Sequence, residues 1–265
     1  MISKVLIALT DLLGAIDKIH LALMLGWQDI KQRYRRSKLG PFWLTISMGI
    51  MITMIGIIFG QALAVSLQDY LPHVACGIIF WNFISSGINE GSSSFISSAG
   101  MIRQLGLPLT LYPMRIMWRN IVVLAHNVII IPLVFIVVGK AINFNILWFI
   151  PGFLLLVLNV FWISVLLGVC CTRFRDLPPI VASLVQVFFY ITPILWVPST
   201  VTARVSTWIV NVNPGYHLLE LVRAPLLGYC PSYVSWLVAI VFAVLGSLFT
   251  LCFFGAYKRR IAYWI

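Results

Sequence analysis

The sequence is short of charged residues. Only 9% of its 265 residues are charged, and 7 acidic residues stand against 18 Lys and Arg. Soluble domains usually carry about 25% charged residues. The chain is 61% hydrophobic with a mean hydropathy of +1.02. A folded surface exposes much of any chain of this size to solvent. We therefore expect a membrane protein, in which lipid surrounds the apolar surface.

The sequence also lacks the common motifs of catalysis and metal binding. It contains no P-loop, no H-E-x-x-H and no G-x-S-x-G pattern. The 5 cysteines show no C-x-x-C spacing, which argues against a zinc site, and a disulfide framework is not expected. His126 is the one candidate for a proton relay within a predicted span, and a hydrogen-bonded structural histidine is the alternative. We expect this chain to be no enzyme and to bind no cofactor or metal of its own.

Uncharged apolar runs divide the chain into about six predicted transmembrane helices. Crossing the hydrocarbon core takes about 20 residues, and each run is long enough to supply them. The runs cover residues 39–68, 70–89, 120–139, 141–172, 177–203 and 224–257. The fourth helix should begin near Ile146 and the sixth near Tyr233. The predicted fold is an all-α polytopic membrane protein.

Basic residues are unevenly divided between the two sides of this topology. With the N-terminus in the cytoplasm, only Lys140, Arg204 and Arg223 of the 18 Lys and Arg residues fall on the other side. Cytoplasmic loops are enriched in Lys and Arg, so both termini are predicted to be cytoplasmic. The net charge of +11 then reflects topology and contact with anionic lipid. No nucleic-acid partner is expected.

Two segments outside the spans carry amphipathic patterns. Residues 1–38 repeat apolar side chains at helical spacing among charged ones, which is typical of a helix in the cytoplasmic interface. Residues 197–231 are broken by Asn213-Pro214-Gly215, a turn sequence. Their prolines favour re-entrant periplasmic helices between spans five and six over a further crossing. We expect a single domain over 1–265, with the interface helix in 1–38, the spans in 39–257 and a cytoplasmic tail in 258–265.

A basic patch closes the amphipathic segment. Its members are Arg33, Tyr34, Arg35, Arg36 and Lys38. Such a patch can fix topology or contact anionic lipid. It can also bind the phosphates of a lipid-linked substrate, because the Arg guanidinium pairs bidentately with phosphate. The sequence leaves both interpretations open.

Aromatic residues make up 14% of the chain. Many would anchor the helices at the membrane interface. Others either face lipid or neighbouring helices, or line a conduit for a sugar chain, since aromatic faces offer contact area with little hydrogen-bond specificity. The conduit candidates are Trp43, Phe59, Trp81, Phe188, Phe189 and Tyr190.

Three short motifs follow one another along the chain. The first, in 29–43, is carried by Asp29, Ile30, Lys31, Arg33, Tyr34, Ser37, Leu39, Gly40, Pro41 and Trp43. The second comprises Arg173, Phe174, Arg175, Asp176 and Leu177, followed by Gln186, Phe188, Phe189, Tyr190, Thr192, Pro193 and Ile194. The third is Asn213-Pro214-x-Tyr216. Together they resemble the ABC-2-type permeases for polysaccharide export, with O-antigen exporter permeases the most similar and teichoic-acid and capsule exporters related. Pro178-Pro179 departs from the family pattern.

The resemblance implies a homodimer in the bacterial inner membrane. Two copies of a separate nucleotide-binding ABC subunit would bind ATP and Mg. The loop 90–113 would contain the coupling helix that docks on that subunit, with Arg103, Gln104 and Leu105 in its centre. The outer loop would form a periplasmic gate that includes Trp208, Asn213, Pro214 and Tyr216.

The same resemblance implies a substrate class. It would be a long glycan on an undecaprenyl-pyrophosphate carrier, as used in lipopolysaccharide biosynthesis. The alternatives are an ABC-2 permease for a small molecule or lipid, a membrane-embedded transferase, and a secondary transporter. The transferase would need a cluster of catalytic side chains, and the secondary transporter would need ionisable groups within the membrane.

Overall fold

The computed structural model describes residues 2–35, 42–63, 65–141, 143–198, 208 and 210–265, and no described residue lies in a strand. The helices are α1 (Ile2–Asp17), α2 (Ile19–Tyr34), α3 (Phe42–Ala62), α4 (Leu67–Ser92), α5 (Ser94–Ser97), α6 (Ala99–Gln104), α7 (Leu111–Val128), α8 (Ile130–Val138), the 3-10 helix η1 (Phe144–Trp148), α9 (Phe149–Arg173), α10 (Leu177–Ile191), α12 (Pro214–Leu226) and α13 (Tyr233–Trp264). The predicted all-α class is confirmed.

Among the described residues, five helical segments are long and apolar enough to cross a membrane. They are Phe42–Ala62, Leu67–Ser92, Leu111–Val138, Phe144–Arg173 and Tyr233–Trp264. The chain is therefore a multi-pass membrane protein. The predicted fifth span differs from the rest, because α10 has 15 residues. At about 1.5 Å per residue it extends roughly 22 Å, short of the roughly 30 Å hydrocarbon core.

Prolines explain where the boundaries differ from the sequence prediction. Pro193 follows the end of α10 and cannot continue it, because proline lacks a backbone N–H. Pro178 and Pro179 lie in the first turn of α10, where that missing N–H costs nothing, so this departure from the family pattern does not prevent a helix. Pro113 likewise lies in the first turn of α7, which begins nearer the N-terminus than the predicted 120.

The chain ends also differ from their predicted form. The expected single interface helix is two helices, α1 and α2, with Lys18 between them. The expected tail 258–265 continues α13 as far as Trp264.

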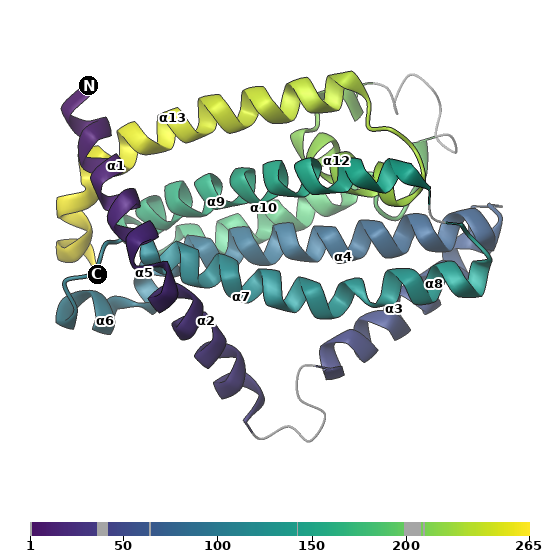
Figure 1. Cartoon of the computed structure of the whole chain (residues 1–265), viewed down its shortest axis with the longest axis horizontal. Coiled ribbons are helices and arrows are strands. Elements are labelled where there is room, and N and C mark those ends of the chain that lie inside the picture. The colour runs from purple at the N-terminus through teal and green to yellow at the C-terminus, as the bar shows by residue number, and fades with distance from the viewer. Residues whose placement is uncertain (1, 36–41, 64, 142, 199–207, 209) are drawn as a thin grey trace.

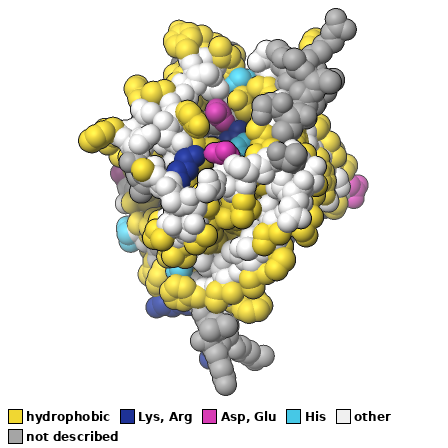
Figure 2. Space-filling model, turned by 90° about the vertical axis from the view of Figure 1, so that its right-hand side faces the viewer, with side chains coloured by type: hydrophobic (Ala, Val, Ile, Leu, Met, Phe, Trp, Pro, Cys, Tyr) yellow, Lys and Arg dark blue, Asp and Glu magenta, His cyan; other side chains and the backbone are white. Residues whose placement is uncertain are grey.

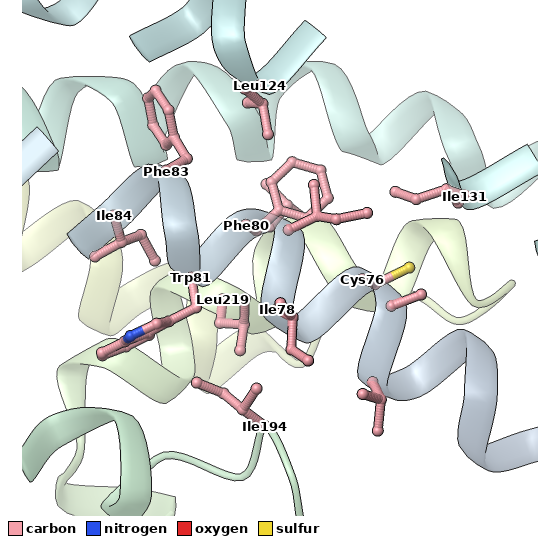
Figure 3. Packing of buried hydrophobic residues seen from close by; sticks show 14 of the residues in the cluster. Cys76, Ile78, Phe80, Trp81, Phe83, Ile84, Leu124, Ile131, Ile194 and Leu219 are labelled. Atoms are coloured by element: carbon pink, nitrogen blue, oxygen red, sulfur yellow. The ribbon is translucent and has the colours of Figure 1, made fainter. Parts of the chain in front are cut away.

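Helix α4 forms the centre of the bundle. Residues 71–80 are all buried, and α3, α7, α8, α9, α10 and α12 pack against α4. Figure 3 shows Phe80, Trp81 and Ile84 of α4 among apolar side chains of neighbouring segments, including Leu124 and Ile194. A stretch that is buried on all sides needs this central position.

The two ends of the bundle carry different elements (Figure 1). Helices α4, α7, α9 and α13 run side by side, and α1 and α2 cross one end of them. Both chain termini and the short helices α5 and α6 lie at that end, here called the termini end. The N-terminus of α4, the C-terminus of α8 and α12 lie towards the other, here called the opposite end.

Candidate functional site

Five charged side chains from α2, α4 and α7 form one ion cluster. Arg115 binds both carboxylate oxygens of Asp29, with Nε at 2.7 Å from Oδ2. Arg119 bridges the two acids, with Nη1 at 3.2 Å from Asp29 Oδ2 and Nη2 at 2.7 Å from Glu90 Oε2. Arg33 Nη2 lies 3.2 Å from Glu90 Oε1. The cluster therefore connects three helices at the C-terminal end of α4.

Close packing of α2 on α7 brings the cluster together. A Cβ on Gly26 would lie 2.8 Å from the carbonyl oxygen of Arg115, so only glycine allows the two backbones this approach. Asp29 follows one helical turn later and thus faces the same helix. The side chains of Asp29, Arg115 and Arg119 are 14%, 17% and 15% exposed. Pairs so deeply placed are retained only when their hydrogen bonds offset the desolvation.

The structure places the described part of the predicted basic patch beside this cluster. Arg33 belongs to the cluster itself, and its side chain is 48% exposed. Arg35 is exposed. The hydroxyl of Tyr34 is buried and meets no hydrogen-bond partner among the described residues. Arg36 and Lys38 lie outside the described residues.

Three of the predicted conduit aromatics lie close together. Trp81 is 7% exposed, and its ring centroid lies 6.1 Å from that of Phe189. Trp81 and Phe188 line an apolar cavity of about 160 Å³ together with Pro214. The cavity lies where α4 and α10 meet the start of α12. The cavity is partly open to the surface of the chain, where Phe188 is 41% exposed.

The other three aromatics lie on outward surfaces. Trp43 and Phe59 of α3 are 55% and 40% exposed, and Tyr190 of α10 is 61% exposed. A single chain thus does not gather the six residues into one conduit. Two apolar helix faces, on α3 and α10, flank α4 and carry the exposed members.

The predicted coupling residues lie at the termini end. Arg103, Gln104 and Leu105 are exposed, with Arg103 and Gln104 closing α6 and Leu105 following it. Arg103 donates a hydrogen bond to the backbone oxygen of Ile265. This short segment is therefore available on the surface and also held against the end of α13.

Asp11 connects the same loop to α1. Its buried carboxylate accepts hydrogen bonds from the backbone N–H groups of Leu109 and Thr110, at 3.2 and 2.9 Å, and from the Thr110 hydroxyl at 2.8 Å. Lys258 Nζ of α13 lies 2.7 Å from Asp11 Oδ1. One carboxylate thus holds α1, the start of α7 and α13 together.

Three of the four predicted gate residues, Asn213, Pro214 and Tyr216, lie at the start of α12. Asn213 caps this helix, because its Oδ1 accepts a hydrogen bond from the Gly215 N–H at 2.9 Å, and its Nδ2 donates to Thr192 Oγ1 at 2.8 Å. Pro214 occupies the first helical position. Burial, reinforced by the nearby Glu220 carboxylate, raises the pKa of Tyr216 to about 12, so its phenol stays protonated. Trp208 is 73% exposed.

A second buried ionic group lies near the capped start of α12. Arg223, only 3% exposed, donates to the Pro193 carbonyl at 2.6 Å and to Glu220 Oε2 at 2.7 Å. Its Nη1 also lies 3.3 Å from His73 Nε2. Figure 2 views the opposite end and shows charged and histidine side chains gathered in a mostly apolar and uncharged face. Arg223 therefore fastens α12 to α4 and to the segment after α10.

Two observations bear on catalysis and proton relay. His126 Nδ1 lies 2.8 Å from the Val122 carbonyl oxygen, and the His126 ring meets Phe42 edge-on. This geometry favours the structural alternative for His126. Within the described part of the chain, no three His, Cys, Asp or Glu side chains are grouped so that they could hold a metal ion.

The sequence prediction missed most of the charged groups that organise the structure. Asp11, Asp29, Glu90 and Glu220 each pair with Lys or Arg. The small number of acidic residues could have pointed to these pairs. The chain has only 7 of them, and an acidic side chain among apolar helices is stable only when it pairs with a cation. The sequence did not predict which Lys or Arg pairs with each acidic residue, because most of these partners lie far away in the chain.

Comparison with known proteins matches most of the chain. The sequence model of the ABC-2 type transporter family matches residues 20–227. Two proteins of Klebsiella pneumoniae named O-antigen export system permease protein RfbA are 27% and 25% identical over 242 and 241 residues, each covering 89% of this chain and 91% of the relative. A protein of the same name from Myxococcus xanthus is 24% identical over 209 residues, covering 77% of this chain and 79% of the relative.

Proposed function

The chain belongs to the ABC-2 type transporter family, and on this basis we propose that it is the transmembrane subunit of an ABC transporter that exports a lipid-linked, O-antigen-like polysaccharide. It is a transport permease and not itself an enzyme, and ATP hydrolysis falls to a separate ATP-binding subunit. The observation that carries the proposal is the alignment of 89% of the chain with relatives named as O-antigen export permeases. The five long apolar helices agree with this role.

We propose that the termini end faces the cytoplasm of a bacterial inner membrane. The exposed segment of Arg103, Gln104 and Leu105 lies there and would contact the ATP-binding subunit, which binds ATP and Mg. Two copies of this chain would form the permease with two ATP-binding subunits. The exposed apolar faces of α3 and α10 support such a homodimer, because they carry the aromatic residues that one chain leaves outside its core.

The proposed substrate is a glycan on an undecaprenyl-pyrophosphate carrier. Arg33 and Arg35 would meet the pyrophosphate where it leaves the inner leaflet, since guanidinium groups bind phosphate oxygens in pairs. The glycan would then advance between the two chains past the aromatic faces. Trp208, Asn213, Pro214 and Tyr216 would form the exit on the periplasmic side.

The contacts of Asp11 support a route for coupling. Motion of the segment of Arg103, Gln104 and Leu105 would reach α7 through Thr110 and reach α1 and α13 through Asp11. The ion cluster would transmit this motion to α2 and α4. Packed helix interfaces have discrete arrangements rather than a soft continuum, so such a motion shifts whole helices.

The decisive experiment is transport by the chain reconstituted with its ATP-binding subunit in lipid vesicles. Wild type should move a lipid-linked glycan across the bilayer with ATP. Arg35→Glu should abolish transport while the complex still assembles, because it places a negative charge in front of the pyrophosphate. Lys18→Glu, an exposed basic residue in the turn between α1 and α2, serves as the control. Full transport by Arg35→Glu would overturn the headgroup role, and transport of small lipids but no glycan would favour the alternative permease.

Cross-linking tests the proposed docking segment. Leu105→Cys and Leu67→Cys are matched, because both side chains are 47% exposed, one at each end of the bundle. A short thiol cross-linker should join only the Leu105→Cys chain to the ATP-binding subunit. Equal yields from both variants would contradict the proposed orientation.

A further inference from the structure

A cavity of about 370 Å³, lined by both polar and apolar side chains, lies between α3, α4 and α7, next to the ion cluster. On α4 its wall is made by Asn82, Ser86 and Glu90. These residues are four apart and share one helix face. On α7 the wall is made by Asn120 and Asn127, seven apart and again on one face. Two helices thus direct polar side chains into the same space.

This cavity extends into the apolar part of the bundle. Asn82 lies about 12 Å along α4 from Glu90, at roughly 1.5 Å per residue. Both helices belong to segments apolar enough to span a membrane. Polar side chains within spans are rare and usually mark a path or a binding site, since lipid offers them no hydrogen bonds. Three asparagines around one cavity at this depth therefore call for a partner.

Among the described residues that line the cavity, one buried side-chain nitrogen has no hydrogen-bond partner. Asn120 is 5% exposed, and its buried Nδ2 finds no hydrogen-bond acceptor among the described residues. By contrast, Asn127 Oδ1 accepts from Thr45 at 3.3 Å, and Asn82 Oδ1 accepts from Ser86 at 3.0 Å. An unmet buried amide costs about 1–3 kcal/mol. This nitrogen is shielded from solvent, so the Asn120 side chain must turn before a ligand in the cavity can supply the missing acceptor.

The charges at the cavity mouth define what chemistry fits. Glu90 is bound by Arg33 and Arg119, so its negative charge is already offset by these two cations. A free phosphate inside would face Glu90, whereas hydroxyl groups match carboxamides, because both donate and accept. Met48 and Leu44 of α3 also line the cavity and suit the C–H face of a ring. The volume lies within the usual range of about 300–1,000 Å³ for small-molecule sites.

We propose that this cavity binds an uncharged sugar ring of the lipid-linked glycan, next to the pyrophosphate held at Arg33. The inference rests on the proposed function and adds a sugar subsite within a single chain. Asn120 donates to a ring substituent, and Asn82 and Asn127 contact further hydroxyl groups. The permease thus distinguishes a glycan-bearing carrier from the bare carrier lipid before transport begins.

The test compares carriers with and without a sugar. The complete complex, in phosphatidylcholine nanodiscs free of glycoside detergents, is titrated with farnesyl pyrophosphate and with farnesyl pyrophosphate bearing glucose or N-acetylglucosamine. Wild type should bind at least one sugar-bearing probe about 10-fold more tightly than the bare probe. Asn120→Leu, similar in volume but without the amide, should reduce this ratio to below 2-fold without changing the affinity for farnesyl pyrophosphate.

Controls separate the subsite from the proposed function. Asn89→Leu makes the same change on α4, at a residue that does not line the cavity, and should keep the wild-type ratio. The sugar subsite would be refuted if Asn120→Leu also kept the wild-type affinity ratio. It would also be refuted if wild type bound no sugar-bearing probe more tightly than the bare probe. Neither outcome would contradict the proposed export function. If wild type bound none of the probes, the lipid-linked substrate itself would be wrong.

Discussion

Thr110 donates both its backbone N–H, at 2.9 Å, and its hydroxyl, at 2.8 Å, to the carboxylate of Asp11. These residues are 99 positions apart. The pair places α1 against the junction between the loop of α6 and the start of α7. Lys258 neutralises the same carboxylate from α13. The N-terminal helix is therefore fixed to the body of the protein by a polar contact as well as by apolar packing.

Replacing Asp11 should loosen this junction. Asp11→Ala leaves two buried N–H groups without their acceptor and Lys258 without its partner, and breaking a buried pair typically costs about 3–5 kcal/mol. We expect a clearly lower midpoint of thermal unfolding in nanodiscs and weaker coupling of ATP hydrolysis to transport. Asp17→Ala changes an exposed acid on the same helix and should leave both unchanged. An unchanged midpoint in Asp11→Ala would mean that apolar packing alone holds α1.

The Asp29–Arg115 pair should show strong energetic coupling. A double-mutant cycle with Asp29→Asn and Arg115→Gln should give a coupling free energy within about 0.5–3 kcal/mol, because directly contacting residues are not additive. Unfolding free energies measured by denaturant titration in mild detergent provide the values. Asp29→Asn combined with Arg103→Gln, at the termini end, should be additive. Additivity in the first cycle would show that the ion pair contributes nothing to stability.

The stability of the interface between α4 and α9 should depend on the side-chain sizes at one contact, Gly87 with Val160. A Cβ on Gly87 would lie 2.4 Å from Val160 Cγ1, so Gly87→Ala should overpack the interface and cost about 1–3 kcal/mol. Val160→Ala removes the clashing methyl groups and should restore much of the stability in the double variant. Gly49→Ala, where the added Cβ meets nothing within 4 Å, is the control. The midpoints of thermal unfolding are compared for wild type and the four variants. A double variant no more stable than Gly87→Ala would argue against this contact.

The Arg223 group should control the order of the segment after α10. Arg223→Met removes the donor to the Pro193 carbonyl and leaves Glu220 without its cation. Hydrogen–deuterium exchange of residues 192–197 should rise at least several-fold, while the core of α4 stays protected. Lys140→Met, a basic residue outside this buried group, should have no such effect. Unchanged exchange in Arg223→Met would mean that the Asn213–Thr192 hydrogen bond, and not Arg223, keeps this segment ordered.

The amino-acid sequence by itself determined the fold class, the main spans and the family. Long apolar runs leave the chain no stable place except the membrane. The family model matches residues 20–227, a range that includes the motif residues from Asp29 to Tyr216. The turn predicted at Asn213-Pro214-Gly215 lies at a helix boundary: Asn213 caps α12, and Pro214 begins it, so these residues start a helix.

Only the tertiary structure decided how the charges and amides meet. Asp29 pairs with Arg115 and Asp11 binds Thr110 from distant parts of the chain, and Asn82 and Asn120 line the same cavity. Hydropathy does not tell which face of a helix meets which neighbour. The shortening of α10 also depended on Pro193, which lies inside an apolar run that composition alone cannot divide. Pairing across helices is a property of packing, because each contact requires two backbones to approach at one depth in the bundle.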